Sequence, residues 1–357
     1  MAARVEQLVA LGLVSQAEND RGGRNPRLLS VNDGFGCVAA VDIGSRHARL
    51  AIIDMSGDII EVEELVVPDR APETFVRWLS EQILRLHADL RGREMAPDVL
   101  LCVGLSVPAP VNVAAGTVVG PTRVPEWHDV PLAGMLSDVL GIDVLMDNDA
   151  TLMALAEHRW HHETQSNMLF VKLGSGIGCG VIVGGEVYRG ESGGAGDIGH
   201  VSVDVPFARA CRCGRTDCLE SSVGGVALIN ELRARGVEVS TLADFARVAQ
   251  EGNPEAVEIA RIAGSAIGEA LAIITNFFNP AVIVIGGGLS TIERLYTSLL
   301  ATLYDRALPI ATLGVSIEPS RNAEDAGIRG AGLLALESVL GAPSVDSRIA
   351  RAGAQSG

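Results

Sequence analysis

A cluster of cysteines near the middle of this 357-residue chain constrains its fold more than any other feature. Cys211, Cys213 and Cys218 lie within eight residues, and His200 precedes them by ten intervening residues. Three thiolates and one imidazole form a complete ligand set for tetrahedral zinc, so we expect a structural Zn²⁺ without an open position for water. The alternative is three unrelated thiols in a surface loop. A disulfide is disfavoured, because Cys211 and Cys213 are too close in sequence for relaxed bridge geometry.

Two carboxylates flank this cluster. Asp197 lies three residues before His200, and Glu220 lies two residues after Cys218. A loop fixed by a metal would hold both side chains at defined positions. Buried sugar hydroxyls need charged acceptors that are positioned beforehand, so the segment predicts a site for a neutral polyol such as a sugar.

Charge and hydropathy exclude two classes of protein. A formal net charge of −16 argues against a body that coats nucleic acid, although it leaves room for a small DNA-reading module. The sequence contains no apolar run long enough to span a membrane. The first sixteen residues are typical of an amphipathic helix and not of a secretory signal, so we expect a cytoplasmic protein whose thiols stay reduced.

The order of strand and helix patterns predicts an α/β protein built from two similar halves. The first half predicts three strands joined by tight turns, then a helix, two strands and a helix: 37–44, 47–54, 58–67, 72–91, 99–107, 142–146 and 149–162. The second half repeats the strand–turn–strand pattern and then predicts helices and strands at 223–236, 241–250, 254–278, 281–290, 313–319 and 327–340. Such a duplication indicates two lobes with a cleft between them.

Glycine turns follow three of the predicted strands. They contain Asp42 and Gly44, then Gly174, Ser175, Gly176 and Gly178, and finally Gly286, Gly287 and Gly288. Glycine lets backbone N–H groups approach phosphate oxygens, so the three turns together predict a nucleotide cleft in which Asp42 would hold Mg²⁺ through water. The alternative is that they are tight turns only.

The junction between the strand 142–146 and the following helix carries Asn148 and Asp149. Strand-to-helix junctions of α/β sheets bind ligands. Asp149 is placed to act as a general base toward a sugar hydroxyl, with Asn148 orienting the sugar. The alternative role for Asp149 is the N-cap of the helix.

Residues 1 to about 32 differ from the rest of the chain. An amphipathic helix, a basic turn rich in Arg and Gly over 21–27, and a short strand over 28–31 resemble the back half of a winged helix, and its front half is missing. Either the start codon is assigned too late or this copy no longer binds DNA. The alternative is a plain N-terminal extension.

These motifs together resemble the ROK family, which groups sugar kinases and sugar-responsive repressors. The family's E-x-G-H and C-x-C-G-x-x-G-C-x-E motifs correspond here to D-I-G-H at 197–200 and C-R-C-G-R-T-D-C-L-E at 211–220. N-D-A at 148–150, L-G-S-G-I-G at 173–178, V-P-A-P-V at 107–111 and I-G-G-G at 285–288 also correspond.

The resemblance implies a two-lobed, actin-like fold of the hexokinase type, related to ribonuclease H, and a homodimer or homotetramer. It implies that Asp149 is the catalytic base in a kinase and that the sugar contacts Asn148, Asp197, His200 and Glu220. It also implies a winged-helix remnant over 1–34, a small lobe over 35–147 and 326–342, and a large lobe with the zinc loop over 148–325. The residues after Ala342 are small and polar, so we expect a disordered tail over 343–357.

Three positions depart from the family pattern. Arg46 replaces the threonine of the first phosphate motif, which removes a hydroxyl that would face phosphate. Asp197 replaces a glutamate that binds sugar, which moves the acceptor inward by one methylene group. Asp217 replaces a glycine inside the cysteine loop, at a cost if its φ is positive.

The sequence therefore favours a sugar-responsive ROK-type transcriptional regulator that binds a hexose or hexose derivative between the lobes. DNA is a partner if the winged helix is complete. The alternative is an ATP-dependent kinase of a hexose or N-acetylhexosamine, with Mg²⁺ and ATP as cofactors, weakened by Arg46. A third possibility is a sugar-binding protein with neither activity.

Overall fold

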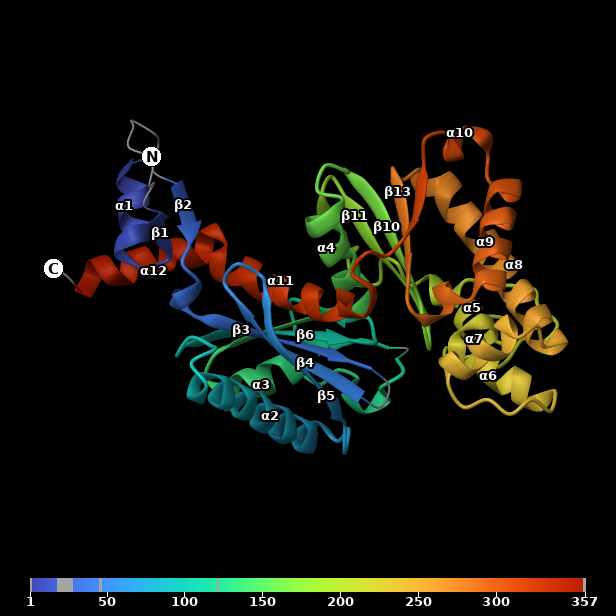
Figure 1. Cartoon of the computed structure of the whole chain (residues 1–357), viewed down its shortest axis with the longest axis horizontal. Coiled ribbons are helices and arrows are strands. Elements are labelled where there is room, and N and C mark those ends of the chain that lie inside the picture. The colour runs from blue at the N-terminus through green and yellow to red at the C-terminus, as the bar shows by residue number, and fades with distance from the viewer. Residues whose placement is uncertain (1, 18–27, 45–46, 121, 356–357) are drawn as a thin grey trace.

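The computed structural model describes residues 2–17, 28–44, 47–120 and 122–355, and two similar five-stranded sheets form its centre (Figure 1). The first sheet has the order β5-β4-β3-β6-β9. Its strands are β3 (Cys37–Ile43), β4 (His47–Asp54), β5 (Ile59–Val66), β6 (Leu100–Val107) and β9 (Asp143–Asn148). The first three form an antiparallel meander, and β6 and β9 continue the sheet parallel to β3.

The second sheet repeats this topology with the order β12-β11-β10-β13-β14. Its strands are β10 (Asn167–Leu173), β11 (Ile177–Val183), β12 (Glu186–Val187), β13 (Val282–Gly286) and β14 (Ser316–Pro319). Again three strands form an antiparallel meander, and two further strands run parallel to its first strand. The predicted duplication of a two-lobed α/β fold is confirmed.

Helices cover both sheets, and two of them lie between the sheets. On the outer face of the first sheet lie α2 (Pro72–Gly92) and α3 (Leu132–Leu140). Between the sheets lie α4 (Asp149–His161) and α11 (Ala326–Leu340). The outer face of the second sheet carries α5 (Leu219–Val223), α6 (Gly225–Ala234), α7 (Leu242–Gln250), α8 (Pro254–Phe278), α9 (Glu293–Arg306) and α10 (Pro309–Thr312).

Short elements complete the chain: β7 (Val111–Asn112), β8 (Thr117–Val118) and the 3₁₀ turns η1 (Asp33–Phe35), η2 (Pro125–Trp127), η3 (Ile198–His200), η4 (Gly288–Thr291) and η5 (Ala323–Asp325). Strands buried on both faces are nearly continuous runs of apolar residues, as β3 and β10 are. Among the described residues, no helix combines the length and the apolar composition that a membrane crossing requires.

Glycines bring the two central helices against their neighbours at backbone distance. A Cβ atom at Gly330 of α11 would lie 2.0 Å from the carbonyl oxygen of Leu152 in α4. A Cβ atom at Gly104 of β6 would lie 1.8 Å from the carbonyl oxygen of Ala331 in α11. Neither position has room for a methyl group, so α11 packs tightly on both the first sheet and α4.

A small module forms where the two ends of the chain meet (Figure 1). It consists of α1 (Ala2–Ala10), the antiparallel hairpin of β1 (Val14–Ala17) and β2 (Leu28–Val31), and α12 (Ala342–Gln355), which continues from α11. An ion pair joins Arg4 to Asp346, and the Arg348 guanidinium lies 5.6 Å from the centroid of the Phe35 ring. The predicted basic turn at 21–27 lies outside the described residues.

The prediction of a disordered tail over 343–357 is wrong for the residues up to 355. These residues form α12, in which Val345 is buried and charged side chains contact the N-terminal segment. The tail is small and polar, but the helix is stabilised by tertiary contacts with residues more than 300 positions away in sequence.

Candidate functional site

A cavity lies between the two sheets, and all of the predicted sugar-binding residues line it. The first sheet and its loops supply one wall, and the second sheet with the 193–200 segment supplies the other. The residues that line it are Pro108, Ala109, Pro110, Thr122, Arg123, Asn148, Asp149, Lys172, Ser175, Gly176, Ile177, Gly178, Gly193, Ala195, Gly196, Asp197, His200 and Glu220.

Asn148 and Asp149 enter the cavity from the junction between β9 and α4. The Asn148 side chain accepts a hydrogen bond from the Thr151 backbone N–H at 3.1 Å and donates one to the Ala109 carbonyl at 3.1 Å. Asn148 is therefore the N-cap of α4, and the alternative of Asp149 as the cap is wrong. Asp149 is the first residue of the helix, and its Oδ1 accepts from the Ala150 N–H at 2.7 Å.

Lys172 was not among the predicted site residues, yet it lines the cavity. It belongs to β10 of the second sheet, and its ammonium donates to Asp149 Oδ2, which follows the first sheet. Their side chains are 22% and 8% exposed, so this ion pair is largely shielded from water. Lys172 is the only lysine among the 28 Lys and Arg residues of the chain, and that singularity was the available signal.

Asp42 lies behind this pair at the end of β3. Its Oδ1 accepts a hydrogen bond of 2.6 Å from the hydroxyl of Ser106, its neighbour in the parallel strand β6. Burial raises the pKa of the Asp42 carboxyl, and the charge of Lys172 opposes that rise. The carboxylate also packs directly on Gly327 at the start of α11. The Asp42 carboxylate thus contacts both Ser106 of the first sheet and Gly327 of α11.

Glu220 lies on the opposite side of the cavity, in the first turn of α5. Its Oε2 accepts from the Ile177 N–H at 3.1 Å and lies 3.7 Å from Arg123 Nη1. A Cβ atom at Gly176 would lie 2.2 Å from the same Oε2, so glycine is required there for this close approach. Arg123 is a second residue that the sequence reasoning missed, because its loop carries no recognisable motif.

Asp197 and His200 approach each other in the turn η3. Asp197 Oδ2 lies 3.9 Å from His200 Nε2, and burial raises the pKa of the Asp197 carboxyl while His200 opposes the rise. The other imidazole nitrogen, Nδ1, points the opposite way and lies 3.4 Å from Cys211 Sγ. His200 therefore presents one nitrogen to the cysteine cluster and the other to the cavity.

The predicted cysteine and histidine cluster is assembled. One ligand atom from each of His200, Cys211, Cys213 and Cys218 lies within 4.8 Å of every other, and the Cys213 and Cys218 sulfurs are 3.4 Å apart. Zn–S bonds of about 2.3 Å at tetrahedral angles place two sulfurs about 3.8 Å apart, so the donor set fits a zinc ion. Burial raises the pKa of the Cys218 thiol to about 12, and a bound cation would displace that proton.

The loop between these ligands is shaped by its own backbone. The Cys211 N–H donates to the Arg215 carbonyl at 2.6 Å, and Gly214 has φ +93°, a conformation that favours glycine. Among the described residues, the non-glycine positions with positive φ are Glu94, Asp129 and Asn279. The expected strain at Asp217 therefore does not arise, and its carboxylate instead accepts a hydrogen bond from the Ser202 hydroxyl.

The glycine turns divide into two groups. Ser175, Gly176 and Gly178 line the cavity, and Gly174 begins the same turn. Gly286, Gly287 and Gly288 lie at the end of β13, packed on Phe170, Leu173 and Leu242, outside the cavity lining. Gly44 is exposed and its carbonyl accepts from Arg70 at 2.8 Å. Arg46 lies outside the described residues.

The duplicated sheets, the interlobe cavity and the adjoining Cys/His cluster define a two-lobed α/β protein with a polar ligand cleft. The sequence model of the ROK family matches residues 38–338, and the chain belongs to this family.

Three proteins illustrate its similarities. The chain is 29% identical over 356 residues to a protein described as a putative xylose repressor from Caldicellulosiruptor sp. strain Rt8B.4, covering 95% of this chain and 88% of the relative. A crystal structure of a ROK family transcriptional regulator, a homolog of the E. coli MLC protein, superimposes with a TM-score of 0.82 at 23% identity, covering 97% of this chain and 89% of that one. The crystal structure of the ROK hexokinase from Thermus thermophilus superimposes with a TM-score of 0.68 at 27% identity, covering 85% of this chain and 99% of that one.

Proposed function

We propose that this chain is a sugar-responsive transcriptional regulator whose interlobe cavity binds a hexose or hexose derivative. The observation that carries the proposal is the terminal module of α1, the β1–β2 hairpin and α12. The similarity to the regulator structure extends over 97% of the chain, whereas the hexokinase is covered almost completely by 85% of it. In the proposal, this helix and hairpin belong to a winged-helix module that contacts DNA.

The cavity offers the chemistry that a neutral sugar needs. In the proposal, the carboxylates of Asp149, Asp197 and Glu220 accept hydrogen bonds from hydroxyls, and Asn148 and His200 Nε2 supply donors. Charged acceptors held by backbone N–H groups and by a metal-bound imidazole need little reorganisation when the ligand arrives, which favours affinity. We further propose that the cluster holds Zn²⁺ and that the protein works in the cytoplasm, where thiols stay reduced.

A single helix connects the region of the cavity with the terminal module. Helix α11 starts beside Asp42, packs between the two lobes and continues into α12, which contacts α1. A sugar that draws the lobes together would therefore shift the base of the terminal module and change its affinity for an operator.

The first test combines a sugar screen with operator binding. We expect one class of sugar to raise the melting temperature and to change the retardation of operator DNA, tested with this chain and with the chain extended by in-frame upstream codons. Glu220→Gln should weaken sugar binding by about 10- to 100-fold, because a charged acceptor is lost. Glu63→Gln, on the distant strand β5, is the matched control. A sugar that binds with full affinity to Glu220→Gln, or an extended chain that binds no operator, would contradict the proposal.

An ATP-dependent sugar kinase is the second candidate. The position of Asp149 in the cavity and the Ser175–Gly178 turn favour it, as does the likeness to a hexokinase. Release of ADP over a panel of hexoses and N-acetylhexosamines, lost in Asp149→Asn, would establish this activity.

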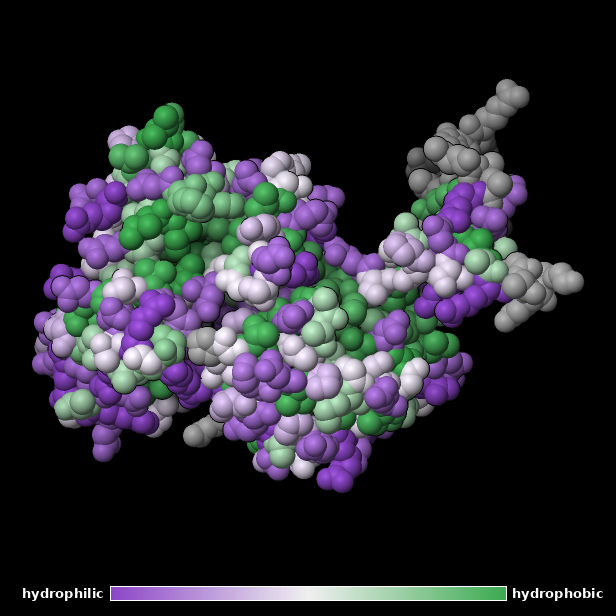
Figure 2. Space-filling view, turned by 180° about the vertical axis from the view of Figure 1, so that it is seen from behind, coloured by the Kyte–Doolittle hydropathy of each residue, from purple (hydrophilic) through white to green (hydrophobic). Residues whose placement is uncertain are grey.

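We also propose that the protein forms a homodimer through an apolar surface at the α8–α10 end of the second lobe. Ile273, Phe277, Ile310 and Leu313 are 65%, 90%, 78% and 84% exposed, and Figure 2 shows hydrophobic side chains gathered at the end of the molecule that carries α10. Exposed apolar patches of this kind are typical of protein interfaces. Phe277→Arg should therefore shift the protein toward monomer in light scattering. Val66→Arg, at a 70% exposed valine on the edge strand β5, is the control. An unchanged mass for Phe277→Arg would refute this interface.

A further inference from the structure

The ammonium of Lys172 in the second lobe interacts with two carboxylates of the first lobe, Asp42 and Asp149. Asp42 lies in β3 and Asp149 follows β9 of the first sheet, and Lys172 of β10 in the second sheet pairs with Asp149. The ammonium donates to Asp149 Oδ2, and its charge also acts on Asp42. No other lysine occurs in the chain, where arginine supplies the remaining 27 of the 28 basic residues counted. The one ammonium side chain of the sequence is therefore used in the cleft, beside Asp149.

The electrostatic balance at this point favours a charged lysine. Burial by itself would lower the pKa of Lys172, but the carboxylates of Asp149 and Asp42 outweigh burial, and the pKa of the ammonium is raised. Without this cation, burial and the neighbouring Asp149 charge would both raise the pKa of Asp42. Lys172 therefore stays protonated, and its positive charge compensates the negative charge of the neighbouring carboxylates.

The same arrangement does not suit a magnesium–nucleotide complex. Mg²⁺ requires oxygen ligands at about 2.0–2.1 Å in near-octahedral geometry and retains several of its waters. Here one Asp149 oxygen is occupied by an ammonium, one Asp42 oxygen accepts from Ser106, and the Asp42 carboxylate is packed on Gly327. A divalent cation bound between these carboxylates would be repelled by the Lys172 ammonium, which already pairs with Asp149.

We propose that the Lys172 ammonium is a built-in counter-ion that replaces the divalent cation between Asp42 and Asp149, so that this cleft binds sugar without Mg²⁺ or nucleotide. The proposal rests on the proposed sugar-binding function and specifies its cofactor requirement. Asp149 then serves as a fixed acceptor. A carboxylate offers about four acceptor positions, and those taken by the Ala150 N–H and by Lys172 leave others for sugar hydroxyls.

The direct test measures divalent cation binding with Mn²⁺ as the probe. We expect no Mn²⁺ site in the wild-type cleft at submillimolar Mn²⁺. Binding is monitored by the electron paramagnetic resonance signal of free Mn²⁺. Lys172→Met, which keeps the length of the side chain and removes its charge, should acquire a weak Mn²⁺ site that disappears in Lys172→Met combined with Asp42→Asn. Arg306→Met, which removes an exposed guanidinium paired with Glu269, is the matched control. A wild-type Mn²⁺ site that depends on Asp42 would overturn the proposal.

The second measurement is sugar affinity by calorimetry, for the sugar selected by the thermal screen. Wild-type sugar affinity should change by less than about twofold among buffer without added divalent cation, millimolar Mg²⁺, and Mg²⁺ with a non-hydrolysable ATP analogue, because neither Mg²⁺ nor the analogue is expected to bind in the cleft. A rise of tenfold or more with Mg²⁺ or the analogue, about 1.4 kcal/mol, would refute the proposal. So would phosphorylation of the sugar that is lost in Lys172→Met, since Lys172 would then be a phosphate ligand.

A third readout uses the wild-type chain only and covers the case in which Lys172→Met does not fold. Reductive methylation with ¹³C-formaldehyde adds a methyl probe to the only lysine and keeps its charge. The Lys172 signal should be insensitive to Mg²⁺, and broadening by stoichiometric Mn²⁺ would count against the proposal. Absence of operator binding together with cation-independent sugar affinity would contradict the proposed regulator function. It would still support the proposed role of Lys172. If no sugar binds, the Mn²⁺ measurement still tests whether Lys172 replaces a divalent cation.

Discussion

Removal of the metal from the His200, Cys211, Cys213 and Cys218 cluster is expected to abolish sugar binding and to lower the melting temperature. Val205 and Phe207 anchor the start of the 201–218 loop in the core, but no side chain of 208–217 is buried, and the four ligand atoms lie within 4.8 Å of one another. A zinc ion bound there would also fix the ring of His200, whose second nitrogen lies 3.9 Å from Asp197. Changes next to a metal ligand typically cost 10- to 100-fold in function, so loss of the ion itself should cost at least about 100-fold in sugar affinity.

Cys218→Ala provides the genetic form of this experiment, and Cys102→Ala is its control. Both thiols are buried, but Cys102 lies in the first sheet, remote from the cluster. We expect about one zinc per chain by elemental analysis for wild type and Cys102→Ala, and strong loss of zinc for Cys218→Ala. Undiminished sugar affinity in metal-free protein would show that the loop needs no ion.

Replacement of Glu157 by alanine is expected to destabilise the fold by about 3–5 kcal/mol, because several buried donors lose their acceptor together. Glu157 lies in α4 with 0% exposure. It accepts hydrogen bonds from the Ser320 hydroxyl at 2.9 Å, the Arg321 N–H at 2.8 Å and the Asn322 side chain at 3.0 Å. This carboxylate therefore holds the segment that leads from the second sheet into α11.

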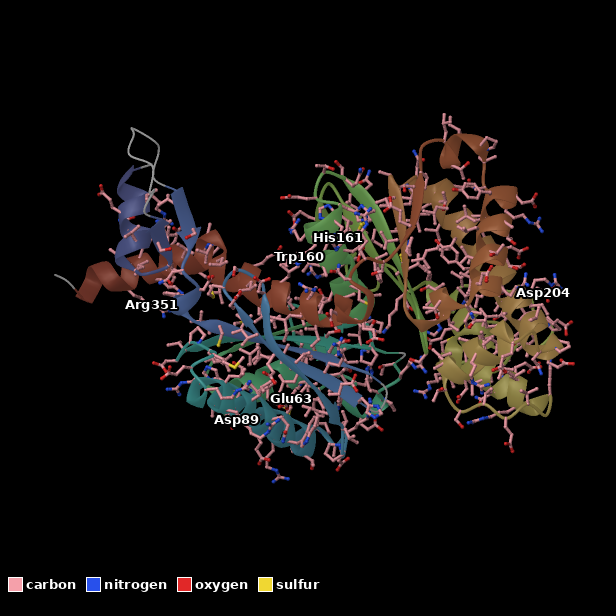
Figure 3. All side chains as sticks on the ribbon, viewed as in Figure 1. Glu63, Asp89, Trp160, His161, Asp204 and Arg351 are labelled. Carbon is pink, nitrogen blue, oxygen red and sulfur yellow. The ribbon has the colours of Figure 1, made fainter. Side chains whose placement is uncertain are left out.

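Glu337→Ala is the matched control for urea unfolding. Glu337 accepts from Arg159 at 2.8 Å, but its side chain is 44% exposed, so its loss should cost less than about 1 kcal/mol. Figure 3 shows that Trp160 and His161 lie at the end of α4 near α11, which is where this surface pair joins the two helices. Equal effects for the two variants would mean that the buried network contributes no more than a surface ion pair.

Sequence patterns predicted the features that depend on short-range spacing. The alternation and apolar runs of β3, β4, β10 and β13 follow directly from burial in sheets, and the cysteine spacing fixes a metal loop without reference to the rest of the fold. The long helices α2, α4 and α8 were predicted nearly to their ends. In each case the residues that determine the structure are neighbours in sequence.

Features that depend on distant contacts were missed. Helices α3 and α9 were not predicted, since α3 is short and lies between Pro131 and Gly141, and α9 is rich in Thr, Ser and Tyr. Helix α12 was mistaken for a disordered tail because its partners are Arg4 and Phe35, at the other end of the chain. Its own composition gives no sign of that docking.

The same reasoning explains why Lys172 escaped notice. In N-M-L-F-V-K-L it occupies a strand position that reads as one polar residue in a buried run. Only the fold brings Asp149, which follows the other sheet, within ion-pair distance of this lysine. Asp149, Asp197 and Glu220 were found because motifs mark them, whereas Arg123 and Lys172 are defined by the partners that the fold gives them.

The single lysine also determines how this molecule responds to amine-directed chemistry. Apart from an α-amino group, acylating reagents, aldehyde cross-linkers and lysine-specific proteases have one target in the chain, and it faces the ligand cleft. Its side chain is 22% exposed and paired, so labelling should be slow and should slow further when a ligand covers it. An ordinary acetylation time course thus becomes a direct reporter of cleft occupancy.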